Sequence, residues 1–320
     1  MTNRRSVLAG LTAMAAFGGF PAQAGKLFGI VASTGMIADT VRVISGDGVQ
    51  LKALMGPGID PHAYRQTRSD ILAMTRADLV FWHGLYLEAQ MEDFFVDLSR
   101  KRQVVAVADA LPKDVLLSHD DYADKYDPHV WMDPDLWTLI VDVITDALTA
   151  AKPNAADTFQ QNAAAYKIEL ARLATYAKDS LAQVPSTSRV LVTAHDAFGY
   201  FGRAYGFEVL GIQGISTESE AGLARIRDLV TLLIERDIGA VFVESSVSDR
   251  NVRALIEGAA AQGHDVQIGG ELFSDAMGQS GTYEGTYLGM IDHNVTTIAR
   301  ALGAPSVPAG GMSGRLAAGS

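Results

Sequence analysis

The sequence predicts an α/β protein of two lobes, each with a parallel sheet flanked by helices, joined by one long α-helix. Apolar runs with strand character alternate with helical patterns, and this alternation occurs twice along the chain. Residues 154–184 separate the two stretches and contain neither glycine nor proline, which favours a continuous helix there. With 48% hydrophobic and 20% charged residues among 320, the chain is able to form a sizeable core.

The N-terminal residues have the pattern of an export signal. The Arg4-Arg5 pair precedes a moderately apolar run, and Ala22-Gln23-Ala24 fits a cleavage site. We therefore expect a signal peptide over residues 1–24, cleaved after Ala24, with export by the twin-arginine or the Sec route. The sequence has no cysteine, so it offers neither a disulfide nor a cysteine for a lipid anchor, and the expected location is the periplasm.

The N-terminal lobe is expected over residues 25–153. Short apolar runs predict its strands, at residues 26–33, 49–55, 77–83 and 103–109. Apolar residues at helical spacing predict a helix over residues 34–45. Asp133 and Pro134 predict the start of another helix, because Asp is a good N-cap and Pro suits the first helical turn.

Residues 154–184 are expected to form the connecting helix. Its apolar residues step by four, three, four and three along one narrow stripe, formed by Phe159, Ala163, Tyr166, Leu170 and Leu173. At 1.5 Å per residue such a helix spans roughly 45 Å, which is long for a helix inside one domain. We expect a rigid connector between two lobes, and the alternative is a surface helix on one of them.

The C-terminal lobe is expected over residues 185–303. Its predicted strands are residues 189–195, 207–212, 239–245 and 264–270. Thr217 and Glu220 have the spacing of a capping box and predict that a helix begins there. A last helix is expected at about 284–302, and residues 304–320, rich in Gly, Pro and Ser, are expected to form a flexible tail.

The charge of the chain restricts its partners. The formal net charge is −11, whereas nucleic acids and anionic membrane surfaces favour proteins with clustered Lys and Arg. We therefore expect no nucleic acid and no membrane surface as a partner, while a cationic ligand is compatible with the charge. Without cysteine, any metal site must use His, Asp and Glu.

Polar residues follow several predicted strands and are candidate ligands. Open α/β sheets bind ligands beyond the carboxyl ends of their strands. His195 and Glu244 end two strands of the C-terminal lobe, and Asp275 lies a few residues beyond a third. His62 lies on the loop after the second strand, and His129 on the segment after the fourth. Because these groups come from both halves of the chain, they could converge in one cleft between the lobes.

The tripeptide Asp-Pro-His occurs twice, as residues 60–62 and 127–129. Each proline fixes its own φ and favours an extended conformation at the preceding Asp, so the histidine is held on a stiff backbone. A pre-ordered side chain loses less entropy when it binds a metal. Asp60 and Asp127 could also accept a hydrogen bond from an imidazole, and the sequence leaves open whether they do. A single such tripeptide is usually only a surface loop, but two of them together with His195 favour a metal site.

The other four histidines are not expected to be ligands. His83 ends a strand and is expected to be a packed core residue beside Trp82. His119 lies in an acidic loop and is expected to be solvated. His264 precedes a strand, and His293 lies on the last helix.

At these residues the sequence resembles the TroA/ZnuA-type solute-binding proteins of bacterial zinc and manganese ABC importers, the cluster A-I family, and most closely its TroA-like branch. The resemblance extends over nearly all of the chain after residue 24. It is carried by "LMGPGIDPHAY", "DPHVWMDP", "VTAHDAFGYFGRAYGFEV" and "QIGGELFSDAMG". The resemblance implies two α/β lobes on one long helix, with metal ligands at His62, His129, His195 and Asp275.

The resemblance also implies a function. The expected role is that of a monomeric periplasmic protein, not an enzyme, that binds Zn²⁺ or Mn²⁺ and delivers it to a membrane permease with a cytoplasmic ATPase. Asp60, Asp127 and Glu244 would then support the ligands. Three imidazoles and one carboxylate suit Zn²⁺, whereas the short loop around His119 lacks the His-rich insertion frequent in zinc-specific relatives, so both metals stay open.

Two alternative functions have less support in the sequence. A secreted metallohydrolase could use the same site, with Glu244 as general base and Asp275 as a labile ligand. The sequence has no HExxH motif and no nucleophile elbow, which argues against it. An adhesin is the third alternative, and nothing in the sequence marks an exposed binding face for it.

Overall fold

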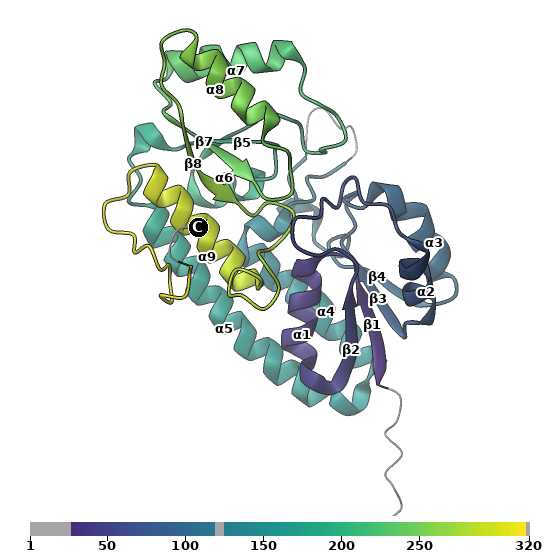
Figure 1. The fold of residues 1–320 in the computed structure, drawn as a ribbon. Helices are drawn as coiled ribbons and strands as arrows, with labels where there is room; N and C mark the ends of the chain where they lie inside the picture. Colours follow the sequence, from purple (N-terminus) through teal and green to yellow (C-terminus); the bar gives the residue numbers. More distant parts are fainter. Residues whose placement is uncertain (1–26, 119–124, 318–320) are drawn as a thin grey trace, which may run out of the picture.

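The computed structural model describes residues 27–118 and 125–317 and has the two α/β lobes predicted from the sequence. Figure 1 shows the two lobes and the long helix α5 (Ala156–Leu181), which runs along both of them. The expected signal peptide and His119 lie outside the described residues. No helix in the described part of the chain is long and apolar enough to cross a lipid bilayer.

The N-terminal lobe contains a parallel sheet, whose strands in spatial order are β2 (Val49–Ala53), β1 (Phe28–Ala32), β3 (Leu79–Trp82) and β4 (Gln103–Ala106). Each strand lies within one of the predicted runs. Successive side chains of a strand point to opposite faces. Ile30 and Phe81 therefore join the core on one face, and Val31 and Val80 join a second core on the other.

Helices cover both faces of this sheet (Figure 1). One face packs on α1 (Gly35–Ser45), and the other on α2 (Arg68–Arg76) and α3 (Glu92–Ser99). Helix α4 (Pro134–Ala151) packs against α1 and α5. The predicted start of α4 is confirmed, because Pro134 is its first residue and the Asp133 side chain accepts a hydrogen bond from the Asp135 amide at 2.9 Å.

The C-terminal lobe contains two parallel strand pairs, β5 (Val190–Thr193) with β6 (Glu208–Gly211) and β7 (Ala240–Glu244) with β8 (Gln267–Leu272). Strands β5 and β7 lie next to each other. The helices of this lobe are α6 (Gly199–Tyr205), α7 (Leu223–Glu235), α8 (Arg250–Ala260) and α9 (Tyr287–Ala301). Helices α7 and α8 pack against each other, and α9 packs between β8 and α5.

One apolar core extends through both lobes. It includes Phe81 of the N-terminal sheet, Leu170 of α5, and Phe242 and Tyr287 of the C-terminal lobe. The side of α5 that carries the predicted stripe is buried in it, from Phe159 to Leu181. The connector helix is thus a packed part of both lobes, and large separation of the lobes would expose this core to water.

Two expectations for the C-terminal lobe are wrong. Helix α7 begins at Leu223, after Gly222 as N-cap, and Thr217 caps no helix because its hydroxyl bonds to Asp60 instead. The expected flexible tail also packs over its described part. Val307 and Leu316 are buried, and the Met312 amide donates to the carboxylate of Asp292 on α9.

Candidate metal centre

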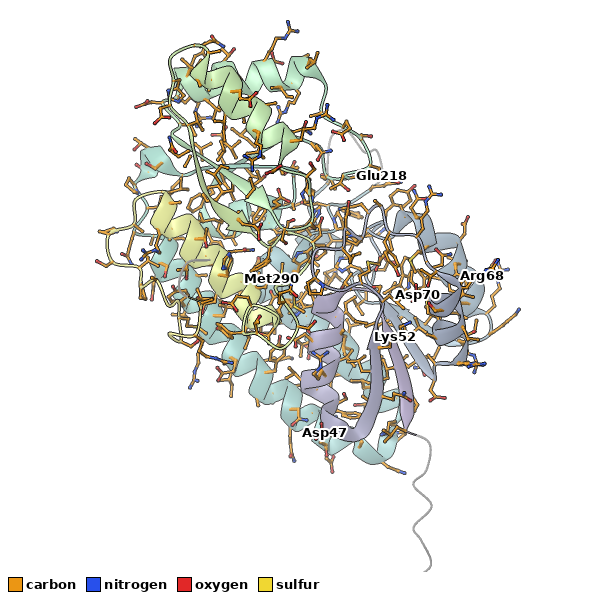
Figure 2. The ribbon with its side chains drawn as sticks, in the orientation of Figure 1. Asp47, Lys52, Arg68, Asp70, Glu218 and Met290 are labelled. Carbon is orange, nitrogen blue, oxygen red and sulfur yellow. The ribbon has the colours of Figure 1, made fainter. Side chains whose placement is uncertain are left out.

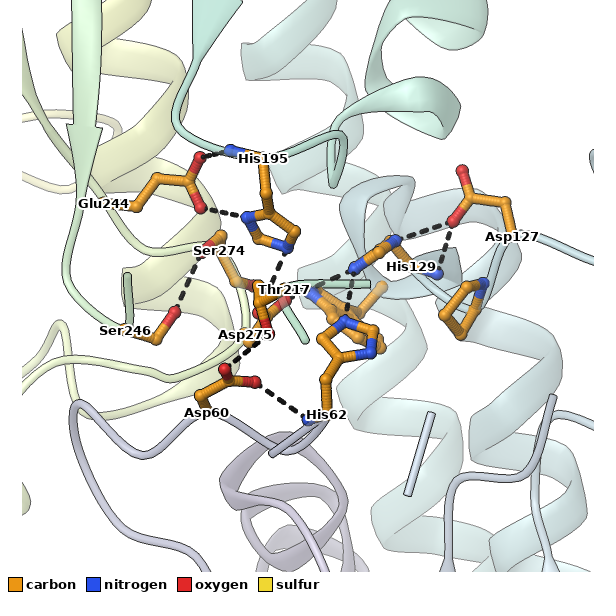
Figure 3. Close-up of polar contacts among 12 residues, drawn as sticks. Asp60, His62, Asp127, His129, His195, Thr217, Glu244, Ser246, Ser274 and Asp275 are labelled. Carbon is orange, nitrogen blue, oxygen red and sulfur yellow. Dashed lines mark hydrogen bonds and ion pairs between the residues drawn. The ribbon is translucent and has the colours of Figure 1, made fainter. Parts of the chain in front are cut away.

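Four buried side chains meet between the lobes, as Figure 3 shows: His62, His129, His195 and Asp275. The two histidines of the N-terminal lobe come from loops, while His195 follows β5 and Asp275 follows β8. One potential ligand atom from each residue lies within 4.8 Å of the other three. The structure thus brings together the four residues predicted from the sequence.

Three of the distances between these atoms are those expected between ligands of one small cation. Nε2 of His62 and Nε2 of His129 are 3.3 Å apart, and the Asp275 oxygens lie 3.4 Å from Nε2 of His129 and 3.2 Å from Nε2 of His195. Ligands in a tetrahedron at about 2.0–2.1 Å from Zn²⁺ are about 3.3–3.4 Å apart. Apart from these ion-pair contacts, Nε2 of His195 and both Asp275 oxygens have no hydrogen-bond partner among the described residues. Buried polar atoms without partners are costly, and a metal ion would satisfy them.

Glu244 lies behind the cluster and orients His195. Its Oε2 accepts a hydrogen bond from Nδ1–H of His195 at 2.5 Å, and its Oε1 accepts one from the His195 backbone amide at 2.9 Å. With the ring proton held on Nδ1, the Nε2 lone pair points at the cluster. The arrangement supports the prediction that Glu244 orients a ligand and is not itself one.

The two Asp-Pro-His tripeptides share one local structure and differ in one contact. In both, the Asp side chain accepts a hydrogen bond from the amide of the histidine two residues later, at 2.8 Å for Asp60 and 2.9 Å for Asp127. Asp127 also accepts Nδ1–H of His129 at 2.7 Å. Asp60 instead accepts the hydroxyl of Thr217, from the other lobe, at 2.5 Å.

The charged groups of the site shift the pKa values of one another. Burial opposes the charged imidazolium of His129, but Asp127 and Asp275 outweigh it and raise the pKa of His129 to about 9. Asp275 and Glu244 likewise raise the pKa of His195 well above its usual value, against the effect of burial. Burial lowers the pKa of His62 to about 3. Despite burial, the two histidines His195 and His129 hold the pKa of Asp275 well below its usual value. Metal binding must therefore displace protons from the site.

Trp131 forms the back wall of the site and was not anticipated. Its ring packs on His129, with ring centroids 5.1 Å apart, and its Nε1–H donates to the carbonyl of Ser274 at 2.8 Å. The Tyr287 hydroxyl in turn donates to the Trp131 carbonyl at 2.8 Å. This buried chain of contacts joins the His129 segment to the residue next to Asp275. The only signal in the sequence was the position of Trp131 two residues after a candidate ligand.

The other described histidines bond to backbone carbonyls and are not members of the cluster. His83 is buried, as expected, but it stacks edge-on against Trp131 and bonds to the Pro128 carbonyl at 2.7 Å. His264 and His293 contact the carbonyls of Ile238 and Glu271. His83 therefore supports the segment that carries His129.

Two lobes on one long helix, with a buried polar cluster between them, form the architecture of a solute-binding protein. Comparison with known proteins identifies the family within this class. The family "ZnuA: Zinc-uptake complex component A periplasmic" matches residues 30–301. The chain therefore belongs to this family of periplasmic zinc-uptake components.

Individual relatives support the assignment. The chain is 48% identical to the manganese-binding lipoprotein MntA of Bacillus subtilis, over 85% of this chain and 89% of MntA. It is 47% identical to the zinc-binding protein TroA of Treponema pallidum, over 85% and 88%. The solved structure of that periplasmic zinc-binding protein TroA superposes with a TM-score of 0.84, over 87% of this chain and 99% of TroA.

Proposed function

We propose that this protein binds one divalent transition-metal ion, Zn²⁺ or Mn²⁺, as cargo and delivers it to an ABC permease. The observation that carries the proposal is the buried cluster of three imidazoles and one carboxylate, with ligand atoms within 4.8 Å of one another. His62, His129, His195 and Asp275 are the proposed ligands. Asp127 and Glu244 orient two of them by hydrogen bonds.

The ligand set favours carriage over catalysis. Four protein ligands close the shell of a tetrahedral ion, whereas catalytic zinc keeps one position open for water or substrate. Glu244, the general base that a metallohydrolase would need, already accepts two hydrogen bonds from His195. We therefore propose a binding protein that is not an enzyme.

Both metals stay in the proposal. Neutral imidazoles and a carboxylate suit Zn²⁺, and the general order of affinities places Zn²⁺ above Mn²⁺. The relatives named for manganese and for zinc are almost equally similar to this chain. A bidentate Asp275, with one oxygen facing His129 and the other facing His195, could raise the coordination number for Mn²⁺.

The location and partners follow from the family. Relatives are described as periplasmic proteins or as lipoproteins of metal ABC transporters, which supports an exported protein. We propose a periplasmic monomer, released after Ala24, that docks on a permease coupled to a cytoplasmic ATPase. The sequence has no cysteine to carry a lipid.

The test is equilibrium metal binding by the chelator-stripped protein. We expect one Zn²⁺ or Mn²⁺ per chain. His62→Ala and His195→Ala should weaken binding by more than the roughly 10- to 100-fold that loss of an outer hydrogen-bond partner costs. His264→Ala, away from the cluster, is the matched control. No stoichiometric binding, or equal affinity in all variants, would refute the proposal. Competition between Zn²⁺ and Mn²⁺ then decides the cargo.

A further inference from the structure

The segment 213–222 of the C-terminal lobe reaches across to the N-terminal lobe. We call it the latch loop. Thr217 donates its hydroxyl proton to Oδ2 of Asp60 at 2.5 Å (Figure 3). Next to it, Gln90 of the N-terminal lobe donates to the carboxylate of Glu218 at 2.6 Å. Figure 2 shows Glu218 where this loop comes down on the N-terminal lobe. Inside the loop, the Gln213 side chain donates to the Ser219 carbonyl at 3.1 Å and so supports its shape.

The residue that Thr217 contacts, Asp60, is also hydrogen-bonded to the proposed ligand His62. While Oδ2 of Asp60 accepts the Thr217 hydroxyl, Oδ1 of the same carboxylate accepts the His62 amide at 2.8 Å. The rings of His129 and His195 are each fixed at Nδ1 by a carboxylate from their own lobe. No such contact to Nδ1 of His62 occurs among the described residues. The carboxylate that supports His62 therefore acts through the backbone amide, and that carboxylate is Asp60.

The latch loop and His62 line the same pocket. A pocket of about 160 Å³ has His62 at one side, with Ser216 and Glu218 of the latch loop and Tyr86 and Lys125 of the N-terminal lobe around it. Of the four proposed ligands, only His62 lines this pocket. Movement of the latch loop would therefore open the site beside His62.

Other contacts between the lobes are buried. Trp131 donates to the Ser274 carbonyl and Tyr287 to the Trp131 carbonyl, and both hydrogen bonds are buried. The contact between Gln90 and Glu218 is exposed, and the one between Thr217 and Asp60 is only partly buried. Exposed side-chain contacts compete with water and break more easily than buried ones.

From this geometry we propose that Thr217 is a positioning residue. Through Asp60 it holds His62 in the metal site, so that the metal is retained only while the latch loop rests on the N-terminal lobe. The inference rests on the proposed metal-binding function and adds to it the step that controls release. Lifting of the loop frees Asp60, then His62, and leaves the cargo on the remaining three ligands.

The test compares three variants of the full chain. Thr217→Val removes the hydroxyl at nearly constant volume, Thr217→Ser keeps it, and Thr231→Val makes the same change on the exposed face of α7. Zn²⁺ release into excess chelator is followed by stopped flow. We expect Thr217→Val to release the metal about tenfold faster, which corresponds to the loss of one hydrogen bond. Thr217→Ser and Thr231→Val should release it at the wild-type rate.

A double-mutant cycle separates positioning from general destabilisation. If Thr217 acts through Asp60, Thr217→Val should have little further effect on release in an Asp60→Ala background. The melting temperature of each metal-free variant shows whether it is folded, and Asp60→Ala alone tests the same chain of contacts should Thr217→Val unfold. If the wild-type protein binds metal but Thr217→Val releases it at the wild-type rate, the proposed role of the latch loop is wrong. Additive effects in the cycle would refute it as well, and neither result would affect the proposed metal-binding function. A wild-type protein that bound no metal would overturn the proposed function as well.

Discussion

Glu244→Gln tests how far an outer hydrogen bond controls the metal site. Glu244 accepts two N–H groups of His195, one from Nδ1 at 2.5 Å and one from the backbone at 2.9 Å. A glutamine has the same size but only one acceptor oxygen, so its NH₂ group would face one of these donors. His195 can relieve that clash by moving its ring proton from Nδ1 to Nε2. The proton then occupies the position that the metal needs.

Two independent magnitudes give the expected loss of Zn²⁺ affinity in Glu244→Gln. Outer-shell substitutions typically cost about 10- to 100-fold in metal affinity, which is about 1.4–2.7 kcal/mol. A hydrogen bond to a charged group contributes about 1.5–3 kcal/mol, which is the same range. We therefore expect Glu244→Gln to bind Zn²⁺ about 10- to 100-fold more weakly, still at one ion per chain.

The assay is competition with a chromophoric chelator at fixed pH and ionic strength. Glu235→Gln makes the same chemical change on the exposed face of α7 and should bind as the wild type does. Melting of the metal-free proteins checks that both variants fold. Wild-type affinity in a folded Glu244→Gln variant would refute the reasoning that Glu244 fixes the tautomer of His195.

Three further predictions concern protons, packing and metal removal. Because the pKa of His129 is raised to about 9, metal binding at neutral pH must displace its proton. The apparent Zn²⁺ affinity should therefore rise about tenfold per pH unit for each displaced proton, and the contribution of His129 should level off above about pH 9; a flat profile between pH 7 and 9 would contradict this. Trp131→Phe removes the bond to the Ser274 carbonyl and should lower the free energy of unfolding by about 1–3 kcal/mol in urea titrations of the metal-free protein, whereas an unchanged value would show that the bond contributes nothing. Zn²⁺ at a free concentration 100 times its Kd should stabilise the protein by about 2.7 kcal/mol, and removal by a chelator should reverse the gain in melting temperature; equal melting temperatures would contradict binding to the native state.

Much of the site could be predicted from the sequence because strand ends are local features. His195 and Asp275 follow apolar runs that are visible in the sequence, and parallel strands bring their carboxyl ends together. The stiff backbone at the two Asp-Pro-His tripeptides was also predictable, since proline acts on its neighbours. The sequence did not predict that Asp60 and Asp127 have different hydrogen-bond partners, because the partner of Asp60, Thr217, comes from the other lobe.

The errors in the C-terminal lobe have the same origin. Thr217 and Glu220 have the spacing of a capping box, but a tertiary contact with Asp60 takes the Thr217 hydroxyl. The composition of the last residues suggested disorder, yet Val307 and Leu316 are buried and Asp292 accepts the Met312 amide. Local patterns describe which structures a segment can adopt, whereas contacts distant in sequence decide among them.

The unbroken core along α5 has a consequence for cooperativity. The largest apolar cluster contains side chains of both lobes packed around this helix, and the clusters confined to one lobe are smaller. Heat or denaturant should therefore unfold the protein in a single transition. Metal binding should then raise the free energy of unfolding of the whole chain, and not of one lobe alone. Amide hydrogens in the middle of α5 that exchange only by global unfolding should exchange more slowly once the ion is bound.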